Sequence, residues 1–384
     1  MNRSDISRAT YLIMAVFLLQ PLALGGWLAL IPQVKADLGL SKSQLAIALM
    51  GIPLAVVPGL QIAGRVISRF GPRRVSAVFF PLQALAFILP LLAWSGPSLF
   101  CVLFFAGLMM AFIEVGMNVY AGRLEKQTTA LIMNRCHGFW AFGLMLGSAT
   151  IAVTGQGMSP QIALAVISAM GGVLAARALV KLPGEETDVA PPRRAMSKLP
   201  PALLLIALFM FVITLVEGVM ADWAAVYLSE RLNDPTARAG LAVTIFSAFL
   251  AGGRFLGDVL KGKFGAMRHA QLTLVCVVLG LLGLILPLPL WVAYIAFAFV
   301  GFGVSAAYPL GVSAVAALDD RYEAPNIAIA ATVAMGGFMI GPPLIGFLGQ
   351  AFSLAIAFAA LLPGVFLAFW LTRWLRPEDQ SESH

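Results

Sequence analysis

Charged side chains are scarce in this sequence. Lysine, arginine, aspartate and glutamate together make up 11% of the 384 residues, whereas a soluble globular domain carries about 25%. Hydrophobic residues make up 60%, and the mean hydropathy is +0.92. This composition excludes an ordinary soluble domain and predicts a polytopic membrane protein.

Cysteine, histidine and catalytic motifs are also sparse. The three cysteines, Cys101, Cys136 and Cys276, all lie inside apolar runs, so we expect no disulfide. His269 is expected in a loop and His384 is the last residue, so neither histidine suggests a metal site. We find no nucleophile–base set and no nucleotide-binding loop. This argues against an enzyme, against ATP-driven transport and against a bound cofactor.

Positive charge is in excess, with a formal net charge of +7. The basic residues are scattered between hydrophobic runs, so membrane loops explain them better than a nucleic-acid partner does. Lysine and arginine mark the cytoplasmic loops of membrane proteins. If both termini are cytoplasmic, nineteen of the 25 basic residues fall on the inner side and four on the outer side. Arg135 and Arg254 then lie within spans and become candidates for function.

Hydrophobic runs of about 20 residues, long enough to cross a bilayer, recur twelve times along the chain. The sequence therefore predicts an all-α integral membrane protein with twelve transmembrane helices. The first run, at about residues 10–34, is longer than a signal-peptide core and is interpreted as a retained span. The charged, proline-rich stretch 182–200 is expected to link two six-helix bundles, residues 1–181 and 201–384, on the cytoplasmic side.

The two halves repeat at a fixed offset of 194 residues. The segment "GLQIAGRVISRFGPRR" at 59–74 aligns with "GRFLGDVLKGKFGAMR" at 253–268. Phe105 and Gly107 align at this offset with Phe299 and Gly301, and two glycines of span five align with two of span eleven. No single match is specific, because glycine is abundant. Three regions that agree on one offset indicate two parallel six-span repeats.

The basic loop after span two, "GRVISRFGPRRV" at 64–75, resembles the loop signature of the major facilitator superfamily. It differs in having Ser68 where that family usually has aspartate, and the second half has Gly262 there. The resemblance implies two bundles around a central cavity lined by spans one, four, seven and ten. It also implies a gate at the inner end. The candidate gating residues are Arg65, Arg69, Arg73, Arg74, Arg254 and Asp258.

Within that family the chain resembles the branch of the fucose–proton symporters. The resemblance rests on Glu114-x-x-x-Asn118 in span four, on "DWAAVYL" at 222–228 with "GGRFLGD" at 252–258, and on Tyr308-Pro309 in span ten. It implies a proton-coupled permease with its site between the bundles. The candidate substrate-binding residues are Gln20, Trp27, Asn118, Arg135, Trp140, Trp223, Tyr227 and Tyr308.

Glu114 is a carboxylate in the middle of an apolar run, "CVLFFAGLMMAFIEVGMNVYAG" at 101–122. Ionisable groups inside a span are costly and are often functional. Glu114 precedes Arg123 by nine residues, or about 13 Å of helix, and His137 and Arg135 of span five lie at a similar depth. Glu114 either forms a structural ion pair that locks spans four and five together, or faces an aqueous cavity and carries a coupling proton. The resemblance favours the second interpretation.

Span seven supplies two further acids, Glu217 and Asp222. In the same span Trp223 and Tyr227 are one helical turn apart, so they are expected to share a face. Such an aromatic pair can stack on a sugar ring, but an interfacial aromatic belt explains both rings equally well. The candidate proton-coupling residues are Glu114, His137, Glu217 and Asp222.

Arg254 and Asp258 lie one turn apart near the inner end of span eight. We expect them to form an intrahelical pair that helps to close the inner gate, rather than a substrate site.

The function expected from these features is secondary active transport of a small polar solute, a sugar or polyol, by alternating access driven by protons. The alternative is a proton-driven exporter of drugs or other amphiphiles, for which the many methionines and phenylalanines are suited, although lipid-facing helices need the same residues. A non-transporting sensor is disfavoured because no appended soluble domain is recognised. The expected partners are the solute, protons and the lipid bilayer, with no nucleic acid. The expected form is a monomer in a bacterial inner membrane.

Overall fold

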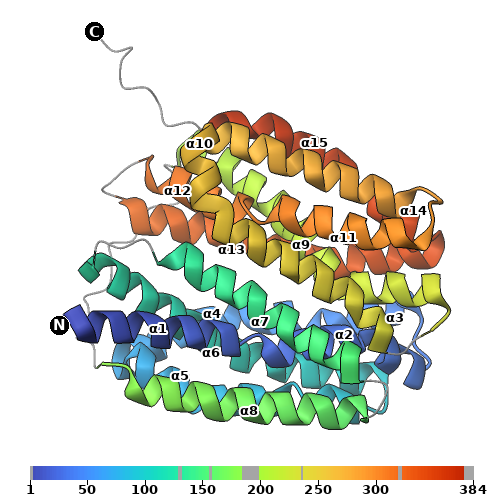
Figure 1. Ribbon diagram of the computed structural model, residues 1–384, viewed down its shortest axis with the longest axis horizontal. Coiled ribbons are helices and arrows are strands. Elements are labelled where there is room, and N and C mark those ends of the chain that lie inside the picture. The colour runs from blue at the N-terminus through green and yellow to red at the C-terminus, as the bar shows by residue number, and fades with distance from the viewer. Residues whose placement is uncertain are drawn as a thin grey trace.

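The computed structural model describes residues 3–128, 132–154, 158–183, 199–234, 237–318 and 322–375. These residues form helices and turns with no strand among them, so the predicted all-α fold is confirmed (Figure 1). The helices of the first half are α1 Arg3–Leu19, α2 Leu22–Asp37, α3 Lys42–Leu49, α4 Gly51–Phe70, α5 Pro72–Ala86, η1 Leu89–Leu92, α6 Gly96–Thr128, α7 Met133–Thr154 and α8 Pro160–Lys181. Those of the second half are α9 Pro201–Leu232, η3 Ala237–Gly240, α10 Leu241–Ile285, α11 Leu290–Val304, α12 Ala307–Ala316, α13 Glu323–Ala351, α14 Leu354–Ala359, α15 Leu362–Leu371 and η5 Thr372–Leu375.

The number of membrane crossings follows from the length of the apolar segments. Among the described residues, eleven segments are long and apolar enough to cross a membrane. The longest, Arg238–Ile285, has 48 residues, or about 72 Å of helix, which is more than twice the bilayer core of about 30 Å. It bends at Gly265, whose φ of 74° and ψ of 162° are not helical. Because this segment accounts for two crossings, the total is the predicted twelve.

The bend at Gly265 has a counterpart 194 residues earlier in the chain. Gly71 separates α4 from α5 with a φ of 83° and a ψ of 148°. Both conformations lie in the positive-φ region that glycine enters without steric cost. The aligned glycines of the two basic loops therefore turn the chain in the same way.

Helix packing repeats at the same offset. A Cβ atom on Gly107 of α6 would collide with the backbone of Ile52 in α4, and one on Gly301 of α11 would collide with the backbone of Phe246 in α10. Phe246 lies 194 residues after Ile52, as Gly301 does after Gly107. Glycine at these two positions lets equivalent pairs of helices approach closely.

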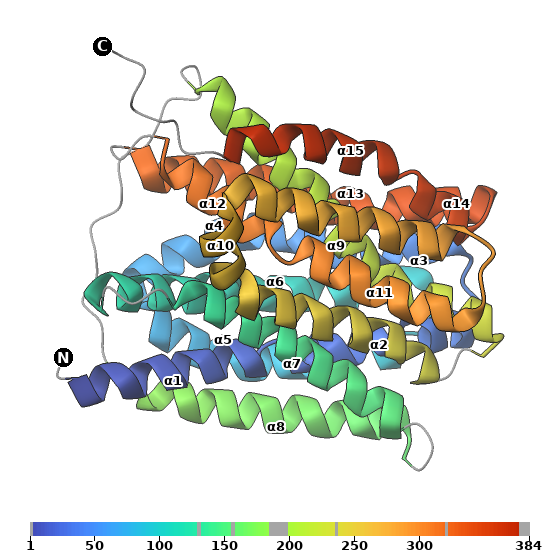
Figure 2. The same cartoon turned by 45° about the horizontal axis from the view of Figure 1, so that its top comes forward.

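The two halves of the chain lie side by side. Figures 1 and 2 show α1–α8 grouped on one side and α9–α15 on the other. Between the groups, α7 packs along α10, α3 packs against α13, and α2 packs against α9. Residues 184–198 of the expected linker lie outside the described residues, so the domain boundaries stay a prediction.

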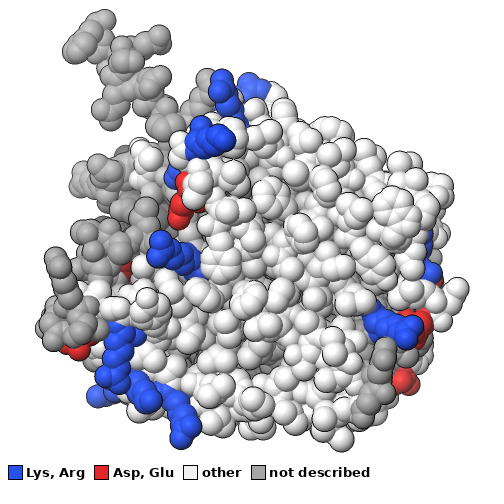
Figure 3. Space-filling model, in the orientation of Figure 1, with Lys and Arg blue, Asp and Glu red and all other residues white. Residues whose placement is uncertain are grey.

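Charge is concentrated at the two ends of the molecule. Figure 3 shows lysine, arginine, aspartate and glutamate at the two ends and a wide uncharged band between them. The start of α1 and the end of α15 lie at one end (Figure 1), where basic side chains are numerous. We call this the inner end, after the orientation that the positive charges predict, and the opposite one the outer end.

The outer ends of the two halves are in close contact. Lys42 Nζ of α3 forms an ion pair with Glu230 Oε1 of α9 at 3.0 Å. The backbone N–H of Lys42 donates to Gln350 Oε1 of α13 at 2.9 Å. A Cβ on Gly346 of α13 would collide with the side chain of Ala46 in α3. These contacts close the outer end in this conformation.

Candidate functional site

Spans one and ten are each broken near mid-depth, beside a proline. Span one is divided into α1 and α2 at Gln20 and Pro21, because proline has no N–H to continue the helical bonding. Span ten is divided into α11 and α12 at Ser305 and Ala306. Ser305 lies four residues before Pro309, whose ring would clash with the Ser305 carbonyl in a continuous helix. Gln20 lies at the first break, and Tyr308 immediately precedes Pro309.

Gln20 is held in a buried hydrogen-bond network. Its Nε2 donates to Gln83 Oε1 of α5 at 3.2 Å, and Gln83 Nε2 donates back to the Gln20 carbonyl at 3.0 Å. Trp140 of α7 donates from Nε1 to Gln20 Oε1 at 2.7 Å. The broken helix is thereby fixed to two neighbouring spans of the first half.

Arg254 of α10 connects this network to the second half. Its Nη2 forms an ion pair with Glu217 Oε1 of α9 at 2.9 Å, and both side chains are about nine-tenths buried. Its Nη1 donates to the backbone carbonyl of His137 in α7 at 3.3 Å. The guanidinium also lies 5.9 Å from the centre of the Trp140 ring, within cation–π range. One arginine therefore contacts both halves.

Glu114 is paired with an amide rather than with a cation. Asn118 Nδ2 donates to Glu114 Oε1 at 3.0 Å and to the Glu114 carbonyl at 2.8 Å. Both side chains are only partly buried. Among the described residues no basic group lies within ion-pair distance of Glu114, although Arg254 is within electrostatic range.

Tyr308 completes this group of side chains. It is partly buried and within electrostatic range of Glu114, Glu217 and Arg254. The cluster thus draws on spans one, four, five, seven, eight and ten, and it holds two carboxylates and one cation. We call it the central polar cluster; its members are Gln20, Glu114, Asn118, Trp140, Glu217, Arg254 and Tyr308.

Trp27 and Trp223 lie outside this cluster. Both rings are fully buried, with 0% of their surface exposed, and neither indole N–H has a hydrogen-bond partner among the described residues. Trp223 packs at the contact between α13 and α3, where its ring approaches Gly346. In this conformation the two indoles are enclosed in the closed outer half.

The expected pairing of Trp223 with Tyr227 is wrong. Tyr227 points into the second half, where its hydroxyl donates to the Leu284 carbonyl at 2.8 Å and accepts from Arg231 at 3.1 Å. Its ring packs against Phe297 and Phe358. Although one turn apart, the two aromatic rings meet different helices, so Tyr227 is a packing residue and not part of a sugar-stacking face here.

The expected intrahelical pair of Arg254 and Asp258 is also wrong. Arg254 pairs with Glu217 of another span, and Asp258 accepts a hydrogen bond from Asn134 Nδ2 of α7 at 2.5 Å. The two side chains diverge because each finds a partner on a neighbouring helix. Asp258 instead joins the two halves near the inner end.

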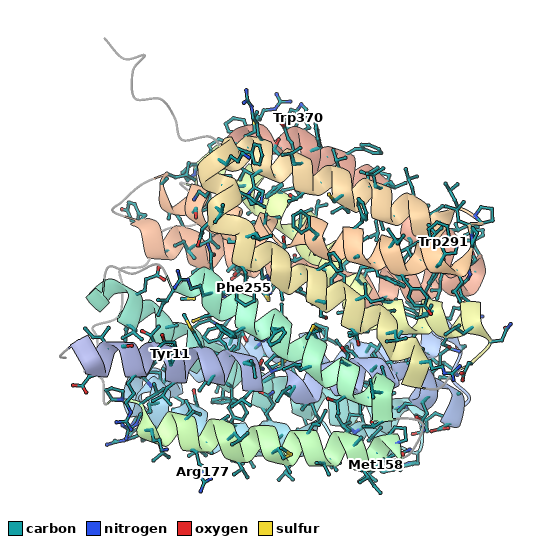
Figure 4. All side chains as sticks on the ribbon, viewed as in Figure 1. Tyr11, Met158, Arg177, Phe255, Trp291 and Trp370 are labelled. Atoms are coloured by element: carbon teal, nitrogen blue, oxygen red, sulfur yellow. The ribbon has the colours of Figure 1, made fainter. Side chains whose placement is uncertain are left out.

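Aromatic packing accompanies this inner contact. The ring of Phe255 in α10 lies edge-on to Phe139 of α7, with 5.4 Å between ring centres. Gly138 leaves room for it, since a Cβ there would lie 2.5 Å from the Phe255 ring. Figure 4 shows Phe255 between α10 and α7, whereas the other labelled aromatic residues, Tyr11, Trp291 and Trp370, are exposed.

The remaining candidate ionisable residues are dispersed. Arg135 is exposed near the inner end of α7, and no ion pair with Glu114 occurs in the described part of the chain. The His137 ring forms a T-shaped contact with Phe17, with 5.5 Å between ring centres. Asp222 is partly buried, and no hydrogen bond to its side chain is seen among the described residues. Glu114 is therefore not locked to span five by an ion pair.

The arginines of the first basic loop do not reach the second half. Arg73 donates to the Leu182 carbonyl at the end of α8, at 2.6 Å, within the first half. Arg65, Arg69 and Arg74 are exposed at the inner end, and Arg69 lies over the ring of its neighbour Phe70. Their expected gating role stays a prediction.

Sequence reasoning missed three residues that position the site. Gln83, Asn134 and Lys42 each bond to a different span. Gln83 could have been found from the sequence, because a glutamine inside an apolar run needs a hydrogen-bond partner on a neighbouring span. For Lys42, the signal was a lysine on a side with few basic residues.

An apolar hollow of about 570 Å³ lies between α3–α4 and α13, apart from the central polar cluster. The described residues that form its walls include no charged side chain. The lining residues are Met50, Leu54, Met339, Ile340, Pro343, Leu344, Phe347 and Leu348.

Comparisons with known proteins agree with this architecture. A family model described as "Major Facilitator Superfamily" matches residues 13–324. The chain is 27% identical to an uncharacterised MFS-type transporter of Yersinia pestis, over 90% of each chain. It is 28% identical to the uncharacterised transporter y4wD of Sinorhizobium fredii, over 93% of this chain and 94% of that one.

Among solved structures, the chain is similar in fold to the nucleoside transporter NupG. The TM-score is 0.73, with 12% identity over 96% of this chain and 99% of the other. At this identity the likeness concerns the fold alone. The family match spans most of the chain, and the fold agrees with it, so this protein belongs to the major facilitator superfamily and is a multi-pass membrane transporter.

Proposed function

We propose that the chain is a proton-coupled permease for a small, neutral, hydroxylated solute such as a sugar or polyol. The observation that carries the proposal is Glu114, a partly buried carboxylate at the centre of the molecule with an amide partner and no cation at ion-pair distance among the described residues. The expected setting is a bacterial inner membrane with both termini cytoplasmic. The charge distribution and the bacterial relatives support it.

The neutrality of the solute follows from how the charges of the central polar cluster are used. Arg254 is already paired with Glu217, so a charged solute would have to displace one of them from a buried ion pair. The Trp140 N–H is already donated to Gln20. Asn118 Oδ1 and the Tyr308 hydroxyl, however, make no hydrogen bond among the described residues, so they can offer acceptors and a donor to a solute. Such a set suits a solute with many hydroxyl groups.

Proton coupling is inferred from the unbalanced negative charge of the central polar cluster. With both acids ionised and Arg254 positive, the cluster carries a net charge of −1 inside the membrane. An isolated charge there is costly, and uptake of one proton removes the cost. Glu114 is the acid without a cation of its own, so we assign the proton to it. Loading from the outside and release to the inside would then drive the solute inward.

The first experiment identifies a ligand. The purified protein is heated with sugars, polyols, nucleosides, organic acids and amphiphiles, and any stabilising compound is tested for uptake into proteoliposomes with and without a pH gradient. Glu114→Gln is expected to keep solute-for-solute exchange but to abolish accumulation driven by the gradient. Asp37→Asn, which removes an exposed carboxylate outside the cluster, serves as control. Gradient-driven uptake at the normal rate in Glu114→Gln would contradict the assignment of the proton to Glu114. Asp222 would then be the candidate for the proton-carrying residue.

A second candidate function is export of an amphiphile, because the apolar hollow between α4 and α13 is open and large enough for an alkyl chain. In that case Leu54→Asn is expected to reduce stabilisation by amphiphiles and to leave stabilisation by sugars unchanged. If only amphiphiles stabilise the protein, and Leu54→Asn weakens their effect, this candidate replaces the first.

A further inference from the structure

His269 is a buried imidazole that the central polar cluster does not use. The sequence suggested a loop, but His269 lies in α10 just after the bend at Gly265 and is 2% exposed. Neither ring nitrogen has a hydrogen-bond partner among the described residues. A buried polar group without a partner costs about 1–3 kcal/mol, so its retention calls for an explanation.

The ring lines a small polar cavity. The bend folds the second limb of α10 back, so that His269 faces the first limb, and the cavity has room of about 20 Å³. That is enough for one water molecule, which needs about 10–15 Å³ by the same measure, and too little for a sugar. The polar lining residues are Asn134, Arg254, Asp258, Lys261, Ser305 and Ser313.

The charges around the cavity favour a neutral occupant. Arg254, Asp258 and Lys261 face it from α10, whereas α7 and α12 contribute only the uncharged Asn134 and Ser313. Arg254 is offset by its ion pair with Glu217, and the two other charged lining residues, Asp258 and Lys261, carry opposite charges. An anion or a metal cation would add an uncompensated charge, whereas a water can pair with both His269 and Asp258.

The cavity also lies between the transport site and the inner gate. On one side it reaches Arg254 of the central polar cluster, and on the other it reaches Asp258, which is exposed and bound to Asn134 of the opposite half. When the halves separate at the inner end, the Asn134–Asp258 bond must break. Asp258 Oδ1 then no longer has Asn134 as its donor.

We propose that His269 and one water in this cavity form the inner proton-exchange site of the transporter; this rests on the proton coupling proposed above. The water accepts a proton leaving the central carboxylates and passes one of its own to the unprotonated ring nitrogen. The imidazolium returns a proton through the same water to Asp258, which releases it to the inner solution. Water and imidazole end as they began.

The test compares gradient-driven uptake with solute-for-solute exchange in proteoliposomes, because exchange needs no net proton transfer. His269→Gln is expected to slow gradient-driven uptake at least tenfold while exchange stays within twofold of the unmodified protein. Thr273→Val is the matched control, since Thr273 lies one turn further along α10 and donates only to carbonyls of its own helix. Ser313→Val narrows the cavity from α12 and is expected to slow uptake in the same selective way, so it decides the matter if His269→Gln does not fold.

The outcomes separate the two proposals. If the unmodified protein accumulates solute without any dependence on the gradient, the proposed proton coupling fails. If Glu114→Gln uncouples transport but His269→Gln and Ser313→Val behave like the unmodified protein, only the exchange site is overturned. A dependence of uptake on chloride that is lost in His269→Gln would also overturn the exchange site, because it would show that the cavity binds an anion instead of a water.

Discussion

Removal of the Arg254 charge tests the central polar cluster most directly. In Arg254→Gln, the Glu217 carboxylate stays about nine-tenths buried without its partner at 2.9 Å. Breaking a buried ion pair from one side costs about 3–5 kcal/mol. At an unfolding entropy of about 2.1 cal/mol/K per residue, a chain of 384 residues has roughly 0.8 kcal/mol/K. The expected fall in melting temperature is therefore about 4–6 °C.

The double variant Glu217→Gln/Arg254→Gln distinguishes a lost pair from lost packing. It leaves two neutral amides that can bond to each other, so most of the stability should return, to within about 1–2 kcal/mol of the unmodified protein. Any remaining deficit reports the Arg254 contacts with the His137 carbonyl and the Trp140 ring. Those two contacts join α10 to the first half.

Melting temperatures of the detergent-purified variants, followed by intrinsic fluorescence, provide the measurement. The exposed pair of Lys42 and Glu230 is the control, with side chains 20% and 42% exposed, and its removal is expected to cost under about 1 kcal/mol. The smallest fall in melting temperature expected for Arg254→Gln from the unfolding entropy is about 4 °C. A fall below about 1 °C would refute the reasoning. So would a double variant no more stable than the weaker of its two single variants.

Three further predictions concern the framework of the site. Lys42→Gln breaks the ion pair with Glu230 and should speed hydrogen–deuterium exchange of the α3 amides, with almost no change in melting temperature. Unchanged exchange would show that this ion pair does not help to close the outer end. Gly107→Val should abolish the yield of folded protein on size-exclusion chromatography, because its Cβ would lie 2.5 Å from a backbone oxygen of α4. The control Gly64→Ala should fold normally, because a Cβ there meets open space. Equal yields of the two variants would contradict the packing argument. Gln83→Leu leaves the buried Nε2 group of Gln20 without its acceptor, so thermal unfolding should report a loss of about 1–3 kcal/mol. Full stability in that variant would show this hydrogen bond to be dispensable.

Patterns that depend on local chemistry were readable in the sequence. Apolar run length gives the crossings because a helix must span a fixed thickness. The glycine alignment at an offset of 194 residues also carried over, since Gly71 and Gly265 adopt the same positive-φ conformation. These features are set by residues close in the chain or by one backbone requirement. No knowledge of partners was needed.

Pairings between spans could not be read in this way. Spacing along span eight brought Arg254 and Asp258 onto one face, but their partners lie 37 and 124 residues away. Likewise Trp223 and Tyr227 have the spacing of a shared face but contact different helices. Helical periodicity states which side chains are neighbours on a helix. It does not state which neighbouring helix each one meets, and that depends on how twelve spans pack.

The charges of the central polar cluster explain why a carboxylate, Glu114, lies inside an apolar span. A lone acid in a span would usually be balanced by a cation, and Arg254 is the only buried cation that the described residues bring near it. Arg254 binds Glu217 at 2.9 Å, however, and so it balances one acid of two. The remaining negative charge can be neutralised by a proton. If Arg254 exchanges Glu217 for Glu114, the unbalanced charge only moves to Glu217. Arg254 also donates to the His137 carbonyl of the first half, so its choice of acid bears on the contact between the halves. We propose that this charge imbalance links protonation of Glu114 to the relative position of the two halves, as proton-driven alternating access requires.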